Sequence, residues 1–180
     1  MKTKLINRVL PLILSFTLFP ISAGWAQGPS GADAPIVTGA FAPRQVMYGD
    51  ILKVYIEADD PNGDMVKIAV AVDQAGYGRY PTSWVYLKSA DRKHFKGYLQ
   101  WNTFSSKTPF LSQWTQTALS ISVFDRAGKE SNVYTFPITF ESGARVSRHE
   151  VPPPFNQGDL PRLGFIDVEL MDFTIFRGDQ

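Results

Sequence analysis

The sequence predicts an all-β protein, an antiparallel immunoglobulin-like β-sandwich of about seven strands followed by an extended C-terminal appendage. Three observations lead to this prediction. Short runs of apolar residues alternate with polar ones, turn-forming residues separate the runs, and no stretch shows the apolar stripe of an amphipathic helix. Because side chains alternate across a strand, each run has one face for a shared core.

The first half of the sandwich is predicted from three runs. A strand at Ile36 to Phe41 opens it. In Ile51 to Ala58 and again in Met65 to Val72 the even-numbered residues are apolar, so each run has one face for the core. The polar segment Asp59 to Asp64 separates these two runs and is typical of a turn.

The second half continues the same alternation. Ser83 to Lys88 and Phe95 to Trp101 come next, with a turn between them. In Ala118 to Asp125 the apolar residues Leu119, Ile121 and Val123 share one face, and in Asn132 to Phe140 the even-numbered positions from 134 on are apolar. Pro137 lacks a backbone N–H, so the last strand is predicted to lie at an edge, at least locally.

Two polar segments at strand ends carry a family resemblance. The first reads Asp59-Asp60-Pro61-Asn62-Gly63-Asp64, and the second reads Asp125-Arg126-Ala127-Gly128-Lys129-Glu130-Ser131. In this order they resemble turns of bacterial immunoglobulin-like and cadherin-like modules. The resemblance implies a non-catalytic module for adhesion, assembly or ligand contact.

The predicted organisation has four parts. Residues 1–26 have a basic start, an apolar run and then small residues, which is typical of a secretory signal peptide. Residues 27–35 read as a flexible leader, 36–142 as the sandwich, and 143–180 as a proline-containing linker with a β-prone end. We therefore expect an exported protein, periplasmic or extracellular, with no membrane-spanning segment in its mature form.

Composition excludes several function classes. Without residues 1–26 the chain has 15 basic and 17 acidic residues, a balance that disfavours nucleic acid as a partner. The chain has no cysteine, so no disulfide stabilises it. His94 and His149 lie in no catalytic motif, and no nucleophile elbow or phosphate-binding loop is present, so no enzyme is expected.

An acidic turn is the first candidate site. Its oxygen-bearing side chains offer ligands suited to calcium. The second polar segment, Asp125 to Ser131, which we call the late hairpin, adds one more such side chain. In a seven-strand sandwich the two turns lie at the same end, which brings these groups together. The alternative is ordinary turn chemistry, in which aspartates accept local backbone N–H bonds. The candidate calcium ligands are Asp59, Asp60, Asn62, Asp64 and Asp125.

Aromatic residues form the second candidate site. Tyr77 and Tyr80 lie in a glycine-containing loop, and Trp84 and Tyr86 share one face of the next strand. Such rings bury a large area at low entropic cost, which suits stacking on a sugar or gripping a partner. The alternative is that the tryptophans, Trp84 among them, are core or loop-anchoring residues.

The C-terminal segment is the third candidate. A stiff spacer at Pro152 to Pro154 precedes a strand-like alternation, with apolar residues separated by acidic ones. The segment either adds a strand to its own sandwich or pairs with an open edge of another protein. The partner-facing residues in the second case are Ile166, Val168, Leu170, Phe173 and Phe176.

Together these patterns indicate an exported, non-catalytic binding or structural module. We expect a subunit of an envelope or extracellular assembly that docks on another protein through its C-terminal segment. The alternative is a carbohydrate-binding module that uses the loop aromatics, with or without calcium. No other cofactor is expected.

Overall fold

A computed structural model describes residues 33–104, 115–141 and 150–171 of the 180-residue chain. The described residues form strands and one 3₁₀ turn, η1 (Ser89–Asp91), and no α-helix, so the all-β prediction is confirmed. The strands are β1 (Ile36–Phe41), β2 (Gln45–Met47), β3 (Ile51–Asp59), β4 (Met65–Gln74), β5 (Gly78–Arg79), β6 (Ser83–Tyr86), β7 (His94–Asn102), β8 (Thr115–Asp125), β9 (Tyr134–Glu141) and β10 (Arg162–Ile166).

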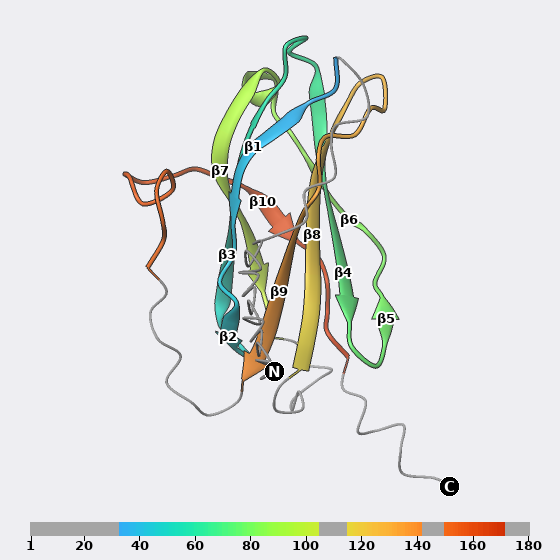
Figure 1. The fold of residues 1–180 in the computed structure, drawn as a ribbon, viewed down its shortest axis with the longest axis vertical. Helices are drawn as coiled ribbons and strands as arrows, with labels where there is room; N and C mark the ends of the chain where they lie inside the picture. The colour runs from blue at the N-terminus through green and yellow to red at the C-terminus, as the bar shows by residue number, and fades with distance from the viewer. Residues whose placement is uncertain (1–32, 105–114, 142–149, 172–180) are drawn as a thin grey trace, which may run out of the picture.

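Two sheets enclose the core (Figure 1). One has the strand order β1-β3-β7-β10, and the other has the order β2-β9-β8-β4-β5, with β6 also paired to β4. The prediction of purely antiparallel sheets is wrong, because β10 runs parallel to β7 and β2 runs parallel to β9. Both parallel pairs involve a strand outside the seven predicted ones. β2 follows β1 after a short connection and pairs with β9, and β10 follows β9 after a long connection and pairs with β7.

All seven predicted strands are present, but one predicted face is wrong. The even-numbered residues of β3 and the odd-numbered apolar residues of β8 are buried, as their alternation indicated. In β4 a register shift between Met65 and Lys67 interrupts the alternation. Met65 therefore lies in the core, whereas Val66 is only half-buried.

Pro137 lies where β9 is locally an edge. It faces Ala118 of β8 on one side. On the other side β2 pairs with β9 only from Thr139 to Glu141, so no ladder bond to β2 is lost at the proline.

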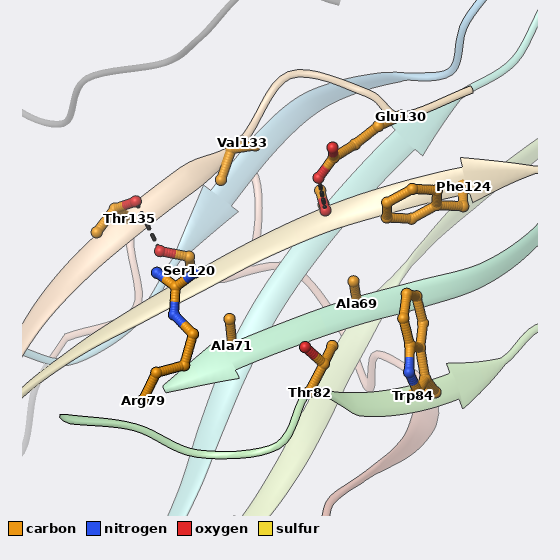
Figure 2. A pocket seen from close by; sticks show the side chains of 11 residues that line it. Ala69, Ala71, Arg79, Thr82, Trp84, Ser120, Phe124, Glu130, Val133 and Thr135 are labelled. Carbon is orange, nitrogen blue, oxygen red and sulfur yellow. Dashed lines mark hydrogen bonds between the residues drawn. The ribbon is translucent and has the colours of Figure 1, made fainter. Parts of the chain in front are cut away.

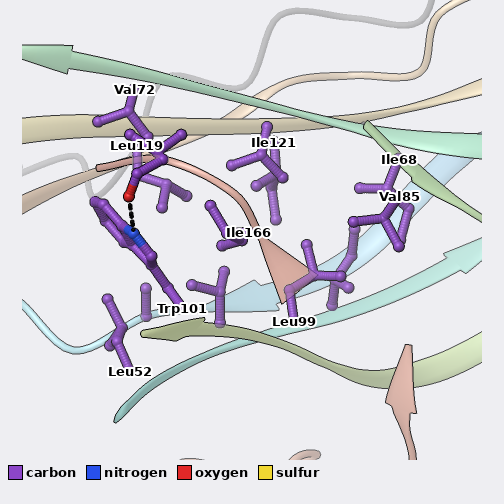
Figure 3. Close-up of a cluster of buried hydrophobic side chains, with 14 of the residues drawn as sticks. Leu52, Ile68, Val72, Val85, Leu99, Trp101, Leu119, Ile121 and Ile166 are labelled. Carbon is purple, nitrogen blue, oxygen red and sulfur yellow. Dashed lines mark hydrogen bonds between the residues drawn. The ribbon is translucent and has the colours of Figure 1, made fainter. Parts of the chain in front are cut away.

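A large apolar cluster fills the space between the sheets (Figure 3). Trp101 is fully buried at its centre, and its ring meets Phe140 edge-on with 5.6 Å between the ring centroids. Its indole Nε1 donates to the backbone oxygen of Val168 at 2.9 Å. Because a buried indole N–H needs an acceptor, this bond ties the C-terminal segment into the core.

The C-terminal strand β10 closes the side of the sandwich between β7 and β6. It pairs with β7, and Asp167, the residue after it, donates its backbone N–H to Ser83 Oγ of β6 at 3.0 Å. Two glycines allow this close approach. A Cβ on Gly97 would lie 2.5 Å from the backbone oxygen of Pro161, and one on Gly164 would lie 2.3 Å from Val85 Cγ1.

The connection to β10 is itself packed on the fold. Phe155, directly after the three prolines, is buried, and its ring centroid lies 5.6 Å from that of Tyr55. A Cβ on Gly39 would meet this ring at 3.4 Å. Residues 152–155 therefore lie against the outer face of the β1–β3 pair, and do not hold the C-terminal segment away from the domain as a stiff spacer would.

Candidate functional site

In the acidic turn, the carboxylate of Asp60 accepts hydrogen bonds from backbone N–H groups of its own loop. Its Oδ1 accepts the N–H of Asn62 at 3.1 Å, and its Oδ2 accepts the N–H of Asp64 at 2.9 Å. Its own N–H donates to the backbone oxygen of Lys93 at 2.9 Å. These bonds are the local turn chemistry that the sequence offered as the alternative to a metal site.

The late hairpin meets this turn at the same end of the sandwich, as predicted. Asp125 is opposite Met65 in the ladder, and the N–H of Arg126 donates to the backbone oxygen of Asp64 at 3.0 Å. Asp125 Oδ1 accepts the N–H of Lys129 at 2.7 Å, which closes the hairpin turn. Two turns far apart in sequence are thus bonded together.

The environment of Asp64 is strongly acidic. Burial is the main cause that raises the pKa of its carboxyl, and a side-chain hydrogen bond with Asp60 and the charges of Asp60 and Asp125 raise it further. The charge of Arg126 opposes the shift. Asp64 Oδ1 is buried and has no hydrogen-bond partner among the described residues.

The other two candidate ligands lie apart from this pair. Asp59 Oδ1 lies 2.8 Å from His94 Nδ1, at hydrogen-bond distance on the exposed surface. Asn62 Nδ2 donates to the backbone oxygen of Asp33 at 3.3 Å. Within the described ranges, no group of three or more His, Cys, Asp or Glu side chains is placed to hold a metal ion. Calcium binding stays a prediction from the sequence.

The four candidate aromatic residues do not form one platform. Tyr80 is only 6% exposed, and its hydroxyl bonds to Gln74 Oε1 and accepts the N–H of Met171 at 2.7 Å. Tyr77 stacks on Tyr80 with 4.7 Å between the ring centroids. Because Gln74 Nε2 also donates to the backbone oxygen of Met171 at 2.8 Å, Tyr80 and Gln74 anchor the end of the described chain.

Trp84 and Tyr86 point outward from β6, since Ser83 and Val85 take the inward positions of this short strand. The exposed fractions are 41% for Trp84 and 73% for Tyr86. The ammonium of Lys67 lies 3.9 Å from the centroid of the Trp84 ring, on one of its faces. Trp84 is thus an exposed aromatic residue held in place by its neighbours, and the expectation that it belongs to the core is wrong.

Trp84 borders a hollow of about 480 Å³ on the outer face of the larger sheet, which we call the Trp84 groove (Figure 2). Its volume lies in the range of small-molecule sites. Small side chains form its floor, and Figure 2 shows Trp84 and Arg79 at opposite ends of the alanines of β4. The lining residues are Ala69, Ala71, Arg79, Thr82, Trp84, Ser120, Ser122, Phe124, Glu130, Val133 and Thr135.

Ladder register explains the groove. Ala69 of β4 lies between Trp84 of β6 and Ser122 of β8, so small residues occupy the centre of the face and a large ring stands at its side. Phe124, two residues along β8, meets Trp84 edge-on with 5.5 Å between the ring centroids. The groove is therefore built into three paired strands.

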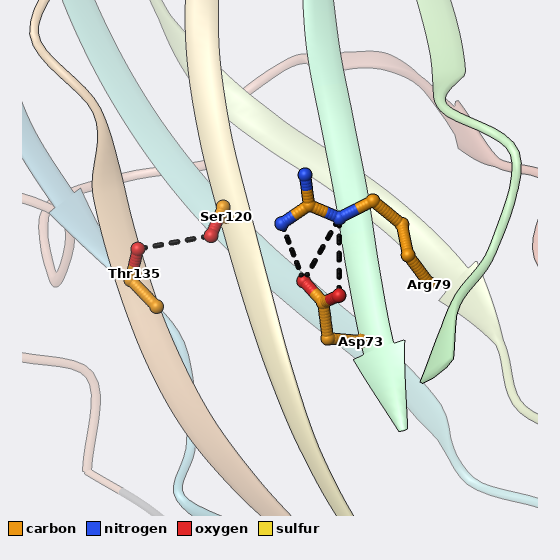
Figure 4. A network of polar contacts seen from close by, with 4 residues as sticks. All are labelled: Asp73, Arg79, Ser120 and Thr135. Atoms are coloured by element: carbon orange, nitrogen blue, oxygen red, sulfur yellow. Dashed lines mark hydrogen bonds and ion pairs between the residues drawn. The ribbon is translucent and has the colours of Figure 1, made fainter. Parts of the chain in front are cut away.

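Hydrogen bonds hold the polar groups around the groove. Arg79 Nε lies 3.0 Å from Asp73 Oδ1, and its Nη2 lies 2.9 Å from Asp73 Oδ2 (Figure 4). Ser120 Oγ lies 2.9 Å from Thr135 Oγ1, also drawn in Figure 4. Ser122 Oγ donates to Glu130 Oε1 at 2.7 Å. These bonds restrict the orientations of the polar side chains around the groove.

The C-terminal segment follows the intramolecular alternative as far as it is described. The exposed fractions of Ile166, Val168 and Leu170 are 4%, 7% and 2%, and all three belong to the core cluster. Their side chains therefore lie in the core of this chain and not on its surface. Phe173 and Phe176 lie outside the described residues, as does the predicted signal peptide at residues 1–26.

Sequence patterns identified Trp84 as a candidate binding residue but did not identify the groove beside it. A weak signal was present: the outward positions of β4 and β8 carry Ala69, Ala71, Ser120 and Ser122, all small, where long polar side chains are usual on a solvated face. Small outward residues on two strands indicate a hollow only when the two strands are known to pair. The pairing of β4 with β8 is part of the tertiary structure and is not visible in the sequence of either strand.

No protein-family model matches the chain, and no curated protein sequence matches it significantly. In the part of the chain that the structure describes, no helix is long and apolar enough to cross a membrane.

Proposed function

We propose that this chain is an exported, non-catalytic binding module with an immunoglobulin-like β-sandwich, and that it takes its ligand in the Trp84 groove. The strand order supports the fold assignment: β1, β3 and β7 share one sheet and β4, β8 and β9 share the other, like strands A, B, E and C, F, G of an immunoglobulin domain. One departure is that β10 occupies the position beside β7.

The groove is the observation that carries the binding function. Trp84 is fixed between Lys67 and Phe124 yet stays 41% exposed, at the side of a hollow whose polar groups are already oriented. Rigid aromatic residues beside pre-positioned polar groups are typical of binding sites. Because Ile166 and Val168 are buried in the core, we propose this groove, and not the C-terminal segment, as the binding surface.

The polar pairs of the groove support a non-catalytic role. Ser120 and Ser122 bond to Thr135 and Glu130, and neither bonds to a histidine that would activate it as a nucleophile. Export is proposed from the composition of residues 1–26.

Affinity capture tests the binding function. The mature chain, residues 27–180, is used as bait for proteins and glycans from envelope and culture-supernatant extracts, alongside Trp84→Ala and the control Tyr86→Ala. Tyr86 is more exposed, lies two residues away on the same face, and does not line the groove. Capture that is lost with Trp84→Ala and kept with Tyr86→Ala supports the proposal. Capture that is equal in all three baits, or absent with the wild type, contradicts it.

A further inference from the structure

We propose that the Trp84 groove binds a neutral carbohydrate, with one pyranose ring lying against the indole of Trp84. This inference rests on the proposed binding function and names the class of its ligand. Four features of the groove lead to it: an indole face on the groove side, a rim of hydroxyl groups, balanced charge, and a floor made of paired strands.

One face of the Trp84 indole borders the groove. Lys67 covers one side of the Trp84 ring at 3.9 Å from its centroid and does not line the groove, whereas Trp84 itself does. The face on the groove side stands beside the methyl group of Ala69 and the side chain of Thr82 (Figure 2). A pyranose ring presents a flat patch of C–H groups, which packs on such an aromatic face and is held there by burial.

The rim of the groove matches the hydroxyl groups of a sugar. Thr82 and Thr135 contribute hydroxyls, which both donate and accept. Glu130 uses Oε1 on Ser122, and Arg79 uses Nε and Nη2 on Asp73, so Glu130 Oε2 and Arg79 Nη1 take no part in these bonds. A carboxylate oxygen and a guanidinium N–H at fixed positions can each bond one sugar hydroxyl.

Charge favours a neutral ligand over an anion. Arg79 is neutralised by Asp73, and the remaining charges near the groove, those of Lys67 and Glu130, have opposite sign. A site for phosphate or nucleic acid needs an excess of cations, which this face does not have.

The position of the groove disfavours an extended peptide. Strands bind peptides through free main-chain groups at a sheet edge. The groove lies on the face of β4 and β8, which pair with each other from Met65 opposite Asp125 to Gln74 opposite Thr117. Over this floor, side chains alone are presented to a ligand, which fits the side-chain recognition of sugars. Arg79, Thr82 and Trp84 line the groove from β5, β6 and the step between them, at the edge of the sheet.

The test is a titration of the mature chain with soluble neutral oligosaccharides: cellohexaose, xylohexaose, mannohexaose, maltohexaose and chitohexaose. Binding is measured by calorimetry, with tryptophan fluorescence as a second readout in the wild type. We expect at least one sugar to bind, Trp84→Ala to weaken its Kd by about tenfold or more, and Trp84→Phe to weaken it less. The control Tyr86→Ala is expected to stay within about twofold of the wild type.

Two results overturn the inference. One is the absence of binding heat with every sugar of the panel, and the other is sugar binding that Trp84→Ala leaves unchanged. Thermal unfolding of each variant shows whether a loss of binding reflects a loss of fold. If the capture experiment identifies a protein whose binding is lost with Trp84→Ala, and none of the sugars binds, the binding function holds and the carbohydrate class is wrong.

Discussion

The indole Nε1 of Trp101 and the backbone oxygen of Val168 form a 2.9 Å hydrogen bond inside the core, although 67 positions separate the two residues. The bond joins β7 to the segment after β10. It shows that the C-terminal segment, as far as Met171, is part of the sandwich, and that its apolar residues complete the space between β6 and β7.

Truncation before β10 is therefore expected to unfold the protein. A chain that ends at residue 158 loses three buried aliphatic side chains, Ile166, Val168 and Leu170. Each contributes about 1.5–3 kcal/mol, so about 5 kcal/mol or more is lost, which approaches the whole stability of many domains. Urea denaturation followed by circular dichroism, with dye binding to exposed apolar surface, measures this loss.

The matched control is a chain that ends at Met171. It retains every contact described above, and we expect it to unfold cooperatively at a higher urea concentration than the chain that ends at residue 158. A chain cut at residue 158 that unfolds as cooperatively and at the same urea concentration as the control would contradict the core role of β10.

Trp101→Phe is expected to lower the free energy of unfolding by more than the smaller ring alone would. The variant keeps an aromatic ring but leaves the buried oxygen of Val168 without its donor, a penalty of about 1–3 kcal/mol. Trp84→Phe, the control on the surface, is expected to change stability by less than about 1 kcal/mol. Equal free energies of unfolding for the two variants would show that the Trp101 bond adds nothing.

A double-mutant cycle tests the contact of Gly164 with Val85. The methyl group of Gly164→Ala would lie 2.3 Å from Val85 Cγ1, so this single variant is expected to lose about 1–3 kcal/mol through overpacking. Val85→Ala leaves space at the same point. The double variant is expected to be more stable than the sum of the single effects predicts, by about 1 kcal/mol, in urea denaturation. Strict additivity would mean that the contact with Val85 is not what makes Gly164→Ala destabilising.

Local patterns predicted the central strands well. The alternation in β3 and β8 placed their apolar residues on the buried face, because the pleat alone fixes this relation. The pattern failed at Val66, since a register shift depends on the partner strand and not on β4. Short elements such as β5 carry too few residues for a period to be recognised.

The candidate sites were predicted less completely, because their geometry depends on tertiary pairing. The sequence located the acidic turn and the hairpin and predicted that they meet, which the bond from Arg126 to Asp64 confirms. It did not show that Tyr80 is buried and Trp84 exposed, because the burial of each ring depends on segments distant in sequence. The buried position of Tyr80 depends on Met171, 91 residues later.

The carboxyl of Asp64 makes the stability of the acidic turn depend on pH. Burial and the neighbouring carboxylates of Asp60 and Asp125 raise its pKa above the usual 3.8, so the folded protein holds this proton more tightly than the unfolded chain does. The stabilisation is complete below pH 3.8 and is lost as the pH rises through the folded-state pKa. Asp64→Asn, whose amide donates to Asp60 at every pH, is expected to remove this loss.

The measurement is the free energy of unfolding of both proteins from pH 3.5 upward, compared as a difference at each pH. The variant is expected to gain on the wild type as pH rises above 3.8, because only the wild type must then bring an additional charge into the turn. Asp159→Asn, at an exposed position in the connection to β10, controls for the general loss of an acidic residue. A difference that is the same at every pH would mean that the carboxyl of Asp64 binds its proton no more tightly in the folded protein than in the unfolded chain.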